Sequence, residues 1–167
     1  MNTPPDIVGQ EWRLAARPPT RTLEFTAFGF PLGGAFVVGW PAAPGGVRHD
    51  SDGRPVLLHF APARWLVPAP HADIEAVVDA AVQAGAGVIV DVDGKWVELG
   101  LTGPGATRVL ATTLDVDATL ESRECAAVTL FECPAILTRG PRGFAIWLQR
   151  SYEGHFRMVL EGLRAIR

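Results

Sequence analysis

Lysine is nearly absent from this chain of 167 residues. Of its 15 basic residues only Lys95 is a lysine, the arginines form no cluster, and the formal net charge is -3. Proteins that bind nucleic acid present a concentrated cationic surface to the phosphates, so this balance argues against a nucleic-acid partner. Arg13, Arg17 and Arg21 are spaced too sparsely to track a phosphate backbone and are typical of a solvated N-terminal segment.

Long apolar runs are also missing. No segment reaches the roughly 20 apolar residues that a membrane-spanning helix requires, which argues against a membrane protein. The first residues, Met-Asn-Thr-Pro-Pro-Asp, show no basic stretch followed by an apolar one, so no signal peptide is visible. We therefore expect a cytoplasmic protein.

Cysteine is scarce as well, with Cys125 and Cys133 the two in the chain. We place them on the two strands of a tight hairpin that turns near residues 132 and 133. About eight strand residues at about 3.3 Å each would separate the two cysteines by more than about 20 Å. A disulfide requires Cα atoms within about 7 Å, so we expect two reduced, packed thiols.

The residues that are present predict a folded protein. Apolar residues make up 48% of the chain and charged residues 20%, a composition typical of globular domains. The length favours a single domain, which we place at residues 21–167. Residues 1–20 are rich in proline and weakly patterned, and we expect them to form a flexible N-terminal extension.

The first half of the chain predicts strands and one helix. Apolar residues at positions 74, 77, 78, 81 and 82 follow helical spacing and predict a helix over residues 72–83. Asp93-Gly94 is a preferred two-residue turn and predicts a hairpin between residues 87–92 and 95–101. A loop rich in Pro, Gly and Asp is expected at residues 41–54. Further strands are expected at residues 22–30, 35–40, 56–60 and 64–67.

In the second half, Gly103-Pro104 predicts the start of a short helix, because proline suits the first helical position. We expect an irregular segment at 113–124 and a last helix at 151–166 capped by the Ser151 hydroxyl. Strands are expected at residues 125–131, 134–139 and 143–149. From residue 64 the order is β-α-β-β-α-β-β-β-α. It predicts an α+β fold with ferredoxin-like elements, in which helices pack on one face of an antiparallel or mixed sheet.

The motifs that could carry chemistry are incomplete. Asp91-Val-Asp-Gly94 lacks the ligand spacing of a calcium loop. His49, Asp50 and Asp52 lie in one Gly/Pro-rich loop, whereas metal sites draw their ligands from several elements. Gly103-Pro104-Gly105 lacks the Gly-Lys-Ser/Thr of a phosphate-binding loop, and we interpret it as a structural helix start. We therefore predict no catalytic, cofactor-binding or metal-ligating residue.

Tryptophan is instead the residue type that points to a function. Four tryptophans lie in or beside predicted strands, and tryptophan is enriched at the centres of protein interfaces. Core packing competes with that interpretation for each of them. The residues that we predict to contact a partner are Trp40, Arg64, Trp65, Trp96 and Trp147.

Several segments resemble the gamma subunit of heterotetrameric sarcosine oxidase, which is related to the folate-binding aminomethyltransferases. The resemblance covers about residues 21–166. The sequence departs from the family pattern at Gly45, Ala61 and Thr113, where we expect asparagine, glycine and cysteine. The similar segments are Gly39-Trp-Pro-Ala-Ala-Pro44, Phe60-Ala-Pro-Ala-Arg-Trp65 through Pro70, Val90-Asp-Val92, Leu101-Thr-Gly-Pro104, Thr113-Leu-Asp115, Cys125 to Thr129, Pro134 to Leu137, and Arg150-Ser-Tyr152.

The resemblance implies an accessory subunit without catalytic residues of its own. Its partners would be the alpha, beta and delta subunits, which would carry the flavins, the NAD and the tetrahydrofolate. The assembly would oxidise sarcosine or a related N-methyl amine and transfer the one-carbon unit to tetrahydrofolate. It also implies the folate-binding aminomethyltransferase-like fold.

Two alternatives remain open at this point. A stand-alone folate- or pterin-binding protein, or one similar to an aminomethyltransferase, could use Asp91, Asp93 or Asp115 to accept pterin hydrogen bonds. A regulatory interaction domain with no attached enzyme explains the tryptophans equally well.

Overall fold

The structure is a computed structural model, and it describes residues 5–9, 11–17, 21–28, 40–41, 43–68, 70, 72–140 and 142–164. The chain folds into two compact units, which we name after their sheets. The five-stranded unit comprises Thr20–Gly94 and Arg123–Ala126, and the six-stranded unit comprises Met1–Pro19, Lys95–Ser122 and Ala127–Arg167. The sequence predicts one domain over residues 21–167, whereas the structure divides this range between the two units.

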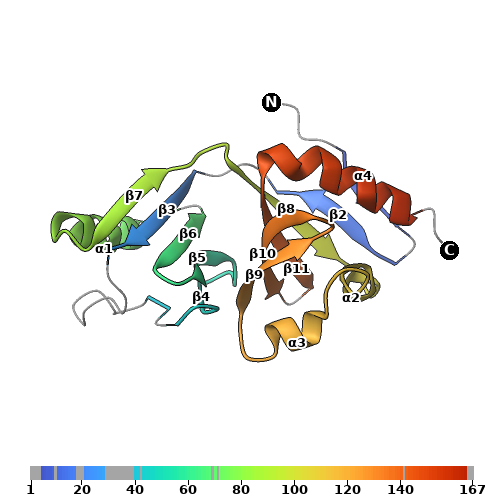
Figure 1. The fold of residues 1–167 in the computed structure, drawn as a ribbon, viewed down its shortest axis with the longest axis horizontal. Helices are drawn as coiled ribbons and strands as arrows, with labels where there is room; N and C mark the ends of the chain where they lie inside the picture. Colours follow the sequence, from blue (N-terminus) through green and yellow to red (C-terminus); the bar gives the residue numbers. More distant parts are fainter. Residues whose placement is uncertain are drawn as a thin grey trace. The chain divides into compact units, whose positions relative to one another are not determined.

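In the five-stranded unit the strand order is β4-β5-β6-β3-β7, and every described pairing is antiparallel. The helix α1 (Ala72–Gln83) covers one face of this sheet (Figure 1). It contributes Ile74, Val78 and Ala81 to the core, as the helical spacing of the sequence predicts. The strands are β3 (Thr22–Ala27), β4 (Val47–His49), β5 (Pro55–Ala61), β6 (Arg64–Pro68) and β7 (Gly87–Asp91).

In the six-stranded unit the order is β1-β2-β8-β11-β10-β9. The helix α4 is fixed by Phe156, which is fully buried and has its ring centroid 5.6 Å from that of Phe131. The strands are β1 (Ile7–Val8), β2 (Arg13–Ala16), β8 (Trp96–Thr102), β9 (Cys125–Leu130), β10 (Cys133–Gly140) and β11 (Gly143–Gln149). The helices are α2 (Ala106–Leu110), α3 (Val116–Leu120), the 3-10 helix η2 (Arg150–Tyr152) and α4 (Glu153–Arg164).

The α+β class is confirmed, but the expectation of a single sheet with helices on one face is wrong. The predicted hairpin around Asp93-Gly94 is wrong for the same reason. Gly94 adopts a φ of 76°, and the Asp93 N–H donates to Asp91 Oδ1, so the chain does turn there. The two flanking strands nevertheless join different sheets, because β7 pairs with β3 while β8 pairs with β2 and β11. Long-range pairing thus overrides the local turn preference.

The described part of residues 1–20 includes two strands. Strand β2 pairs with β8, and its residue Leu14 is fully buried. The neighbouring strand β1 pairs with β2, and Arg157 Nη1 donates to the Pro5 carbonyl at 3.1 Å. The composition of this segment gave no sign of the two strands, which extend the sheet beyond β8.

Three smaller predictions also differ from the structure. The expected loop at 41–54 contains β4, and the expected irregular segment at 113–124 contains α3, whose Asp115 carboxylate accepts from the Ala118 N–H at 3.1 Å. The last helix begins as η2, whose N-cap residue is Gln149, so Ser151 lies inside the first turn and not at the predicted cap position. The predicted strand at 35–40 lies outside the described residues except for Trp40.

Candidate interaction surface

Two of the predicted contact residues, Trp40 and Trp65, lie in the core of the five-stranded unit. Their ring centroids are 5.3 Å apart, and both rings pack against Phe25 at 5.2 and 5.6 Å. His59 stacks on Trp65 at 4.2 Å, and its Nδ1 lies 3.0 Å from the Pro41 carbonyl oxygen. Trp65 is 1% exposed, so its indole has no surface to offer a partner.

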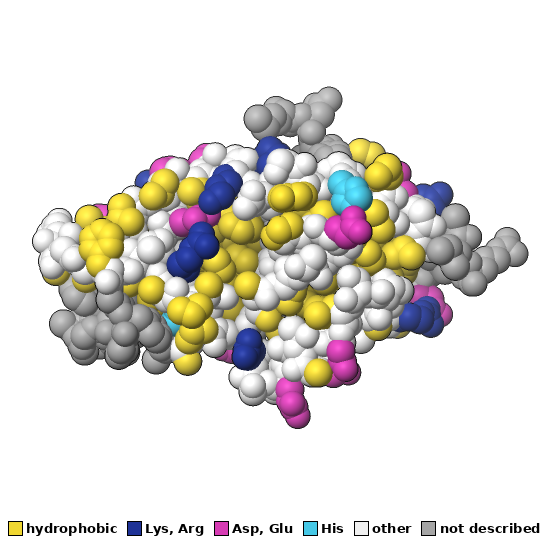
Figure 2. Space-filling view, in the orientation of Figure 1, with side chains coloured by type: hydrophobic (Ala, Val, Ile, Leu, Met, Phe, Trp, Pro, Cys, Tyr) yellow, Lys and Arg dark blue, Asp and Glu magenta, His cyan; other side chains and the backbone are white. Residues whose placement is uncertain are grey.

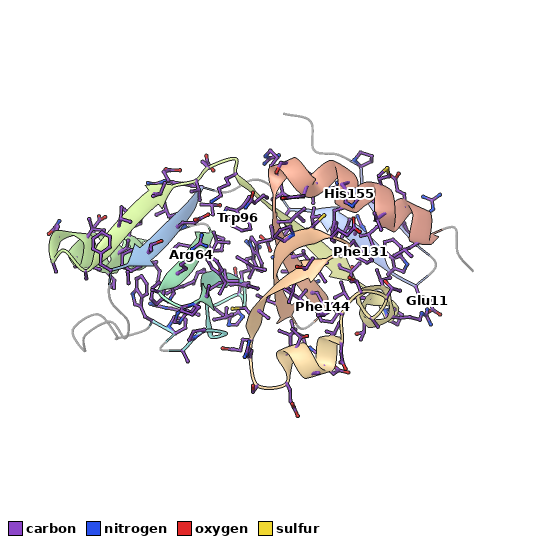
Figure 3. All side chains as sticks on the ribbon, viewed as in Figure 1. Glu11, Arg64, Trp96, Phe131, Phe144 and His155 are labelled. Carbon is purple, nitrogen blue, oxygen red and sulfur yellow. The ribbon has the colours of Figure 1, made fainter. Side chains whose placement is uncertain are left out.

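The other two tryptophans belong to the six-stranded unit. Trp147 lies in the central strand β11, opposite Glu98 and Ile136, and is 2% exposed. Trp96 begins β8, as Figure 3 shows, and is only half-buried. Its ring lies 5.6 Å from Lys95 Nζ. Trp40, Trp65 and Trp147 are thus buried within this chain, while Trp96 keeps an accessible ring, and the interface role of all four stays a prediction.

Arg64, the remaining predicted residue, lies on the surface at the start of β6 (Figure 3). Its guanidinium forms an ion pair with Glu24 at 3.3 Å and lies 5.0 Å from the ring centroid of Phe60. The register pairs Arg64 with Thr26 and Thr26 in turn with Val88. Directly paired residues of neighbouring strands point to the same side, so Arg64 belongs to the sheet face opposite α1.

The β7 end of that face, which we call the open face, carries exposed apolar side chains, whereas Leu58 and Leu66 farther along the same face are fully buried. Phe28, Val88 and Val90 are 72%, 42% and 50% exposed. They share this face because Val90 pairs with Glu24 and Val88 with Thr26, while Phe28 follows at the same alternation. In Figure 2 hydrophobic side chains gather over the strands of this unit, with a few charged ones among them. Single apolar side chains are ordinary on a surface, whereas three on one face of neighbouring strands make this face a candidate interaction surface.

The edge strand β7 adds unpaired backbone groups to this surface. The Phe28 N–H donates to the Ala86 carbonyl and the Val92 N–H to the Thr22 carbonyl, both at 2.9 Å. In an antiparallel pair, residues that bond to the partner alternate with residues that do not. The N–H and C=O groups of residues 87, 89 and 91 therefore point away from β3. Among the described residues, no strand pairs with β7 on that side.

On the α1 side of β7 lies an acidic pocket of about 370 Å³. Arg21 bridges two of its carboxylates, donating to Glu75 at 2.5 Å and to Asp91 at 3.1 Å. The pKa of Asp91 is lowered by the Asp93 N–H bond first and by Arg21 second, so the carboxylate is ionised at neutral pH. The pocket is lined by Arg21, Leu23, Glu75, Asp79, Ile89 and Asp91.

The two buried thiols, which could act as nucleophiles, are held in their unreactive protonated form. Burial raises the pKa of the Cys125 thiol to about 12 and also raises the pKa of Cys133, so both stay protonated. Both cysteines are free and buried, as the sequence predicts. Burial lowers the pKa of His59 below its ordinary value, which keeps the imidazole neutral.

The loop motifs serve local structure. The Asp50 carboxylate accepts from the N–H groups of Asp52 and Arg54, closing the turn before β5. The Gly105 N–H donates to the Glu11 carbonyl at 2.9 Å, which fixes the start of α2. Within the described ranges, no three His, Cys, Asp or Glu side chains are grouped as metal ligands. No helix among the same residues is long and apolar enough to cross a bilayer.

The sequence analysis missed the open face and the edge of β7. Residues 87–91 read Gly-Val-Ile-Val-Asp, an apolar run that we assigned to a hairpin and so to a paired strand. The alternation of the run, with Ile89 toward the core and Val88 and Val90 outward, contained the signal. It could not be used without knowing which edge of β7 is paired.

No family model and no curated protein sequence matches the chain. Among solved structures, the chain is similar to a chain of the heterotetrameric sarcosine oxidase from Corynebacterium sp. U-96, solved in complex with pyrrole 2-carboxylate. The TM-score is 0.76 at 23% sequence identity, and the match covers 96% of this chain and 87% of that one. At this identity the likeness shows that the two chains share a fold over nearly their whole lengths.

Proposed function

We propose that this chain is an accessory, non-catalytic subunit of a heterotetrameric sarcosine-oxidase-type complex, in the position of its gamma subunit. The observation that carries the proposal is the shared fold with a chain of such an enzyme across 96% of this sequence. The segments described in the sequence analysis are the residues on which the same resemblance was predicted.

The proposal assigns the chemistry to other chains. Alpha, beta and delta subunits would carry the flavins, the NAD and the tetrahydrofolate, and the complex would oxidise sarcosine or a related N-methyl amine. This chain would contribute contact surface. Two features support that role: its cysteine thiols are buried and protonated, and the open face of the five-stranded unit presents three exposed apolar side chains.

The test is co-expression with candidate flavoprotein subunits of such a complex, followed by size-exclusion chromatography and an assay of sarcosine oxidation. We expect the chain to elute with those subunits and to show no turnover when purified alone. Elution as a lone monomer in the presence of all candidate partners would contradict the proposal. Oxidation of an N-methyl amine by the isolated chain would contradict it as well.

A stand-alone folate- or pterin-binding protein is the second candidate. It is favoured by the position of Asp91 at a pocket of about 370 Å³, where a carboxylate could accept hydrogen bonds from a pterin. Asp115 is occupied in capping α3, which weakens this candidate. Calorimetry of the isolated chain with tetrahydrofolate separates the two, because a Kd below about 100 μM, or about −5.5 kcal/mol, would favour the second.

A further inference from the structure

We propose that the outer edge of β7 binds an extended segment of another protein chain, one that alternates apolar and basic residues, as an added strand of the five-stranded sheet. This inference rests on the proposed function, because it names the surface through which the chain would contact another subunit. Strand addition of this kind draws affinity from main-chain hydrogen bonds and specificity from alternate side chains.

The first argument is that this edge lacks the features that usually prevent strand addition. Proteins protect sheet edges with very short strands, bulges, prolines or lysines. The opposite edge of the same sheet, β4, has only three residues, contains a register shift at Arg48/His49 and carries a basic side chain there. Strand β7 has five residues in unbroken register with β3 and contains neither proline nor lysine.

The second argument comes from the side chains on the open face. A strand added beside β7 would place every second residue next to Val88 and Val90, which are both about half exposed. Apolar residues at those positions would cover the two valines and extend the contact toward Phe28. The face thus selects apolar residues at alternate positions of the bound segment.

The third argument is charge on the other side of the edge. The residues in between would point toward α1, where Glu75, Asp79 and Asp91 face the pocket and Arg21 is the cation among its lining residues. Arg21 pairs with Glu75 and Asp91, whereas Asp79 forms no ion pair with a residue that the structure describes. Basic side chains at the intervening positions would therefore find a complementary site.

The same charges disfavour a second copy of this chain as the occupant. Two β7 strands paired edge to edge would bring two acidic pockets together on one side of a continuous sheet. Like charges in neighbouring positions across strands are destabilising. A basic segment of a different chain fits both sides of the edge.

The test uses the full-length chain and a synthetic peptide of alternating lysine and valine residues, with binding measured by calorimetry. A peptide of alternating glutamate and valine is the ligand control. We expect only the lysine peptide to bind, and we expect Val90→Lys and Asp79→Lys each to weaken it at least about tenfold. Val8→Lys, at an exposed valine on the edge strand β1, is the matched control and should change the affinity less than about twofold.

Three peptide results would overturn the inference: no binding of the lysine peptide at about 1 mM, equal binding of both peptides, or unchanged binding by Val90→Lys. Sedimentation of the isolated chain tests whether a second copy of this chain occupies the edge of β7. A dimer that Val90→Lys dissociates would identify that copy as the occupant and also overturn the inference.

A second measurement separates this inference from the proposed function. In the co-expressed complex, amide hydrogen exchange in residues 87–91 should slow at least about tenfold relative to the free chain. A complex that incorporates Val90→Lys normally and leaves these amides unprotected would overturn the inference and leave the proposed function standing. Peptide binding by a chain that does not assemble with any partner subunit would support the inference and contradict the proposed function.

Discussion

Replacing Trp65 by alanine should destabilise the five-stranded unit strongly, because the indole is a core residue. Trp65 is 1% exposed and packs between Phe25, Trp40 and the stacked ring of His59. Truncation of a buried tryptophan typically costs about 3–5 kcal/mol, from lost burial and the cavity left behind. That is a fifth or more of the roughly 5–15 kcal/mol that stabilises an ordinary domain.

The assay is thermal unfolding followed by calorimetry. For a chain of this size, 1 kcal/mol corresponds to about 2–4 °C, so Trp65→Ala should lower Tm by about 6–20 °C. If the two units unfold separately, the transition of the five-stranded unit should shift alone. The control is Trp96→Ala, which should cost only about 1 kcal/mol because its ring is half exposed.

One result would refute this reasoning. If Trp65→Ala left Tm within about 2 °C of the wild type but prevented assembly with partner subunits, the indole would be a contact residue after all. That result would support the sequence-based interface prediction for that position.

Three further predictions follow from burial and backbone geometry. Burial lowers the pKa of His59, so below about pH 6.5 the unfolded state binds more protons than the folded state. The free energy of unfolding should therefore decrease as the pH is lowered below that value, by up to about 1.4 kcal/mol per pH unit. His59→Gln should flatten that slope in urea titrations. Cys125, with a pKa of about 12, should react with a thiol reagent at pH 8 roughly a thousandfold slower than in urea; comparable rates would contradict its burial. Gly143→Ala should lower the free energy of unfolding by more than about 1 kcal/mol, since φ is 144° and a Cβ would press on the Leu101 carbonyl. Gly162→Ala should instead stabilise α4 by up to about 1 kcal/mol. Equal Tm values for the two variants would refute this contrast.

The local elements were predictable where short-range signals were strong. Helix α1 has the bounds that its apolar spacing predicts, and the strands β5, β6, β9, β10 and β11 lie within a residue or two of their expected positions. Periodicity reports how one segment divides between core and solvent, which is a local property. The unreactive cysteines followed similarly, because strand geometry alone separates Cys125 from Cys133.

The candidate site was not predictable to the same extent. Tryptophan enrichment at interfaces favoured Trp65 and Trp147, but burial depends on which neighbours cover a strand, and both are core residues. The exposed valines of β7 gave no compositional signal, since Val88 and Val90 are as apolar as core residues.

The sequence by itself determined the α+β class, the positions of most elements and the reduced state of the cysteines. Each of these depends on residues close together in the chain or on simple chain geometry. Only the tertiary structure decided that β7 and β8 belong to different sheets and that residues 7–8 and 13–16 are strands. It also decided that no strand among the described residues pairs with the outer edge of β7. Strand pairing is a contest among distant segments for the same backbone hydrogen bonds, and no local pattern records which segment wins.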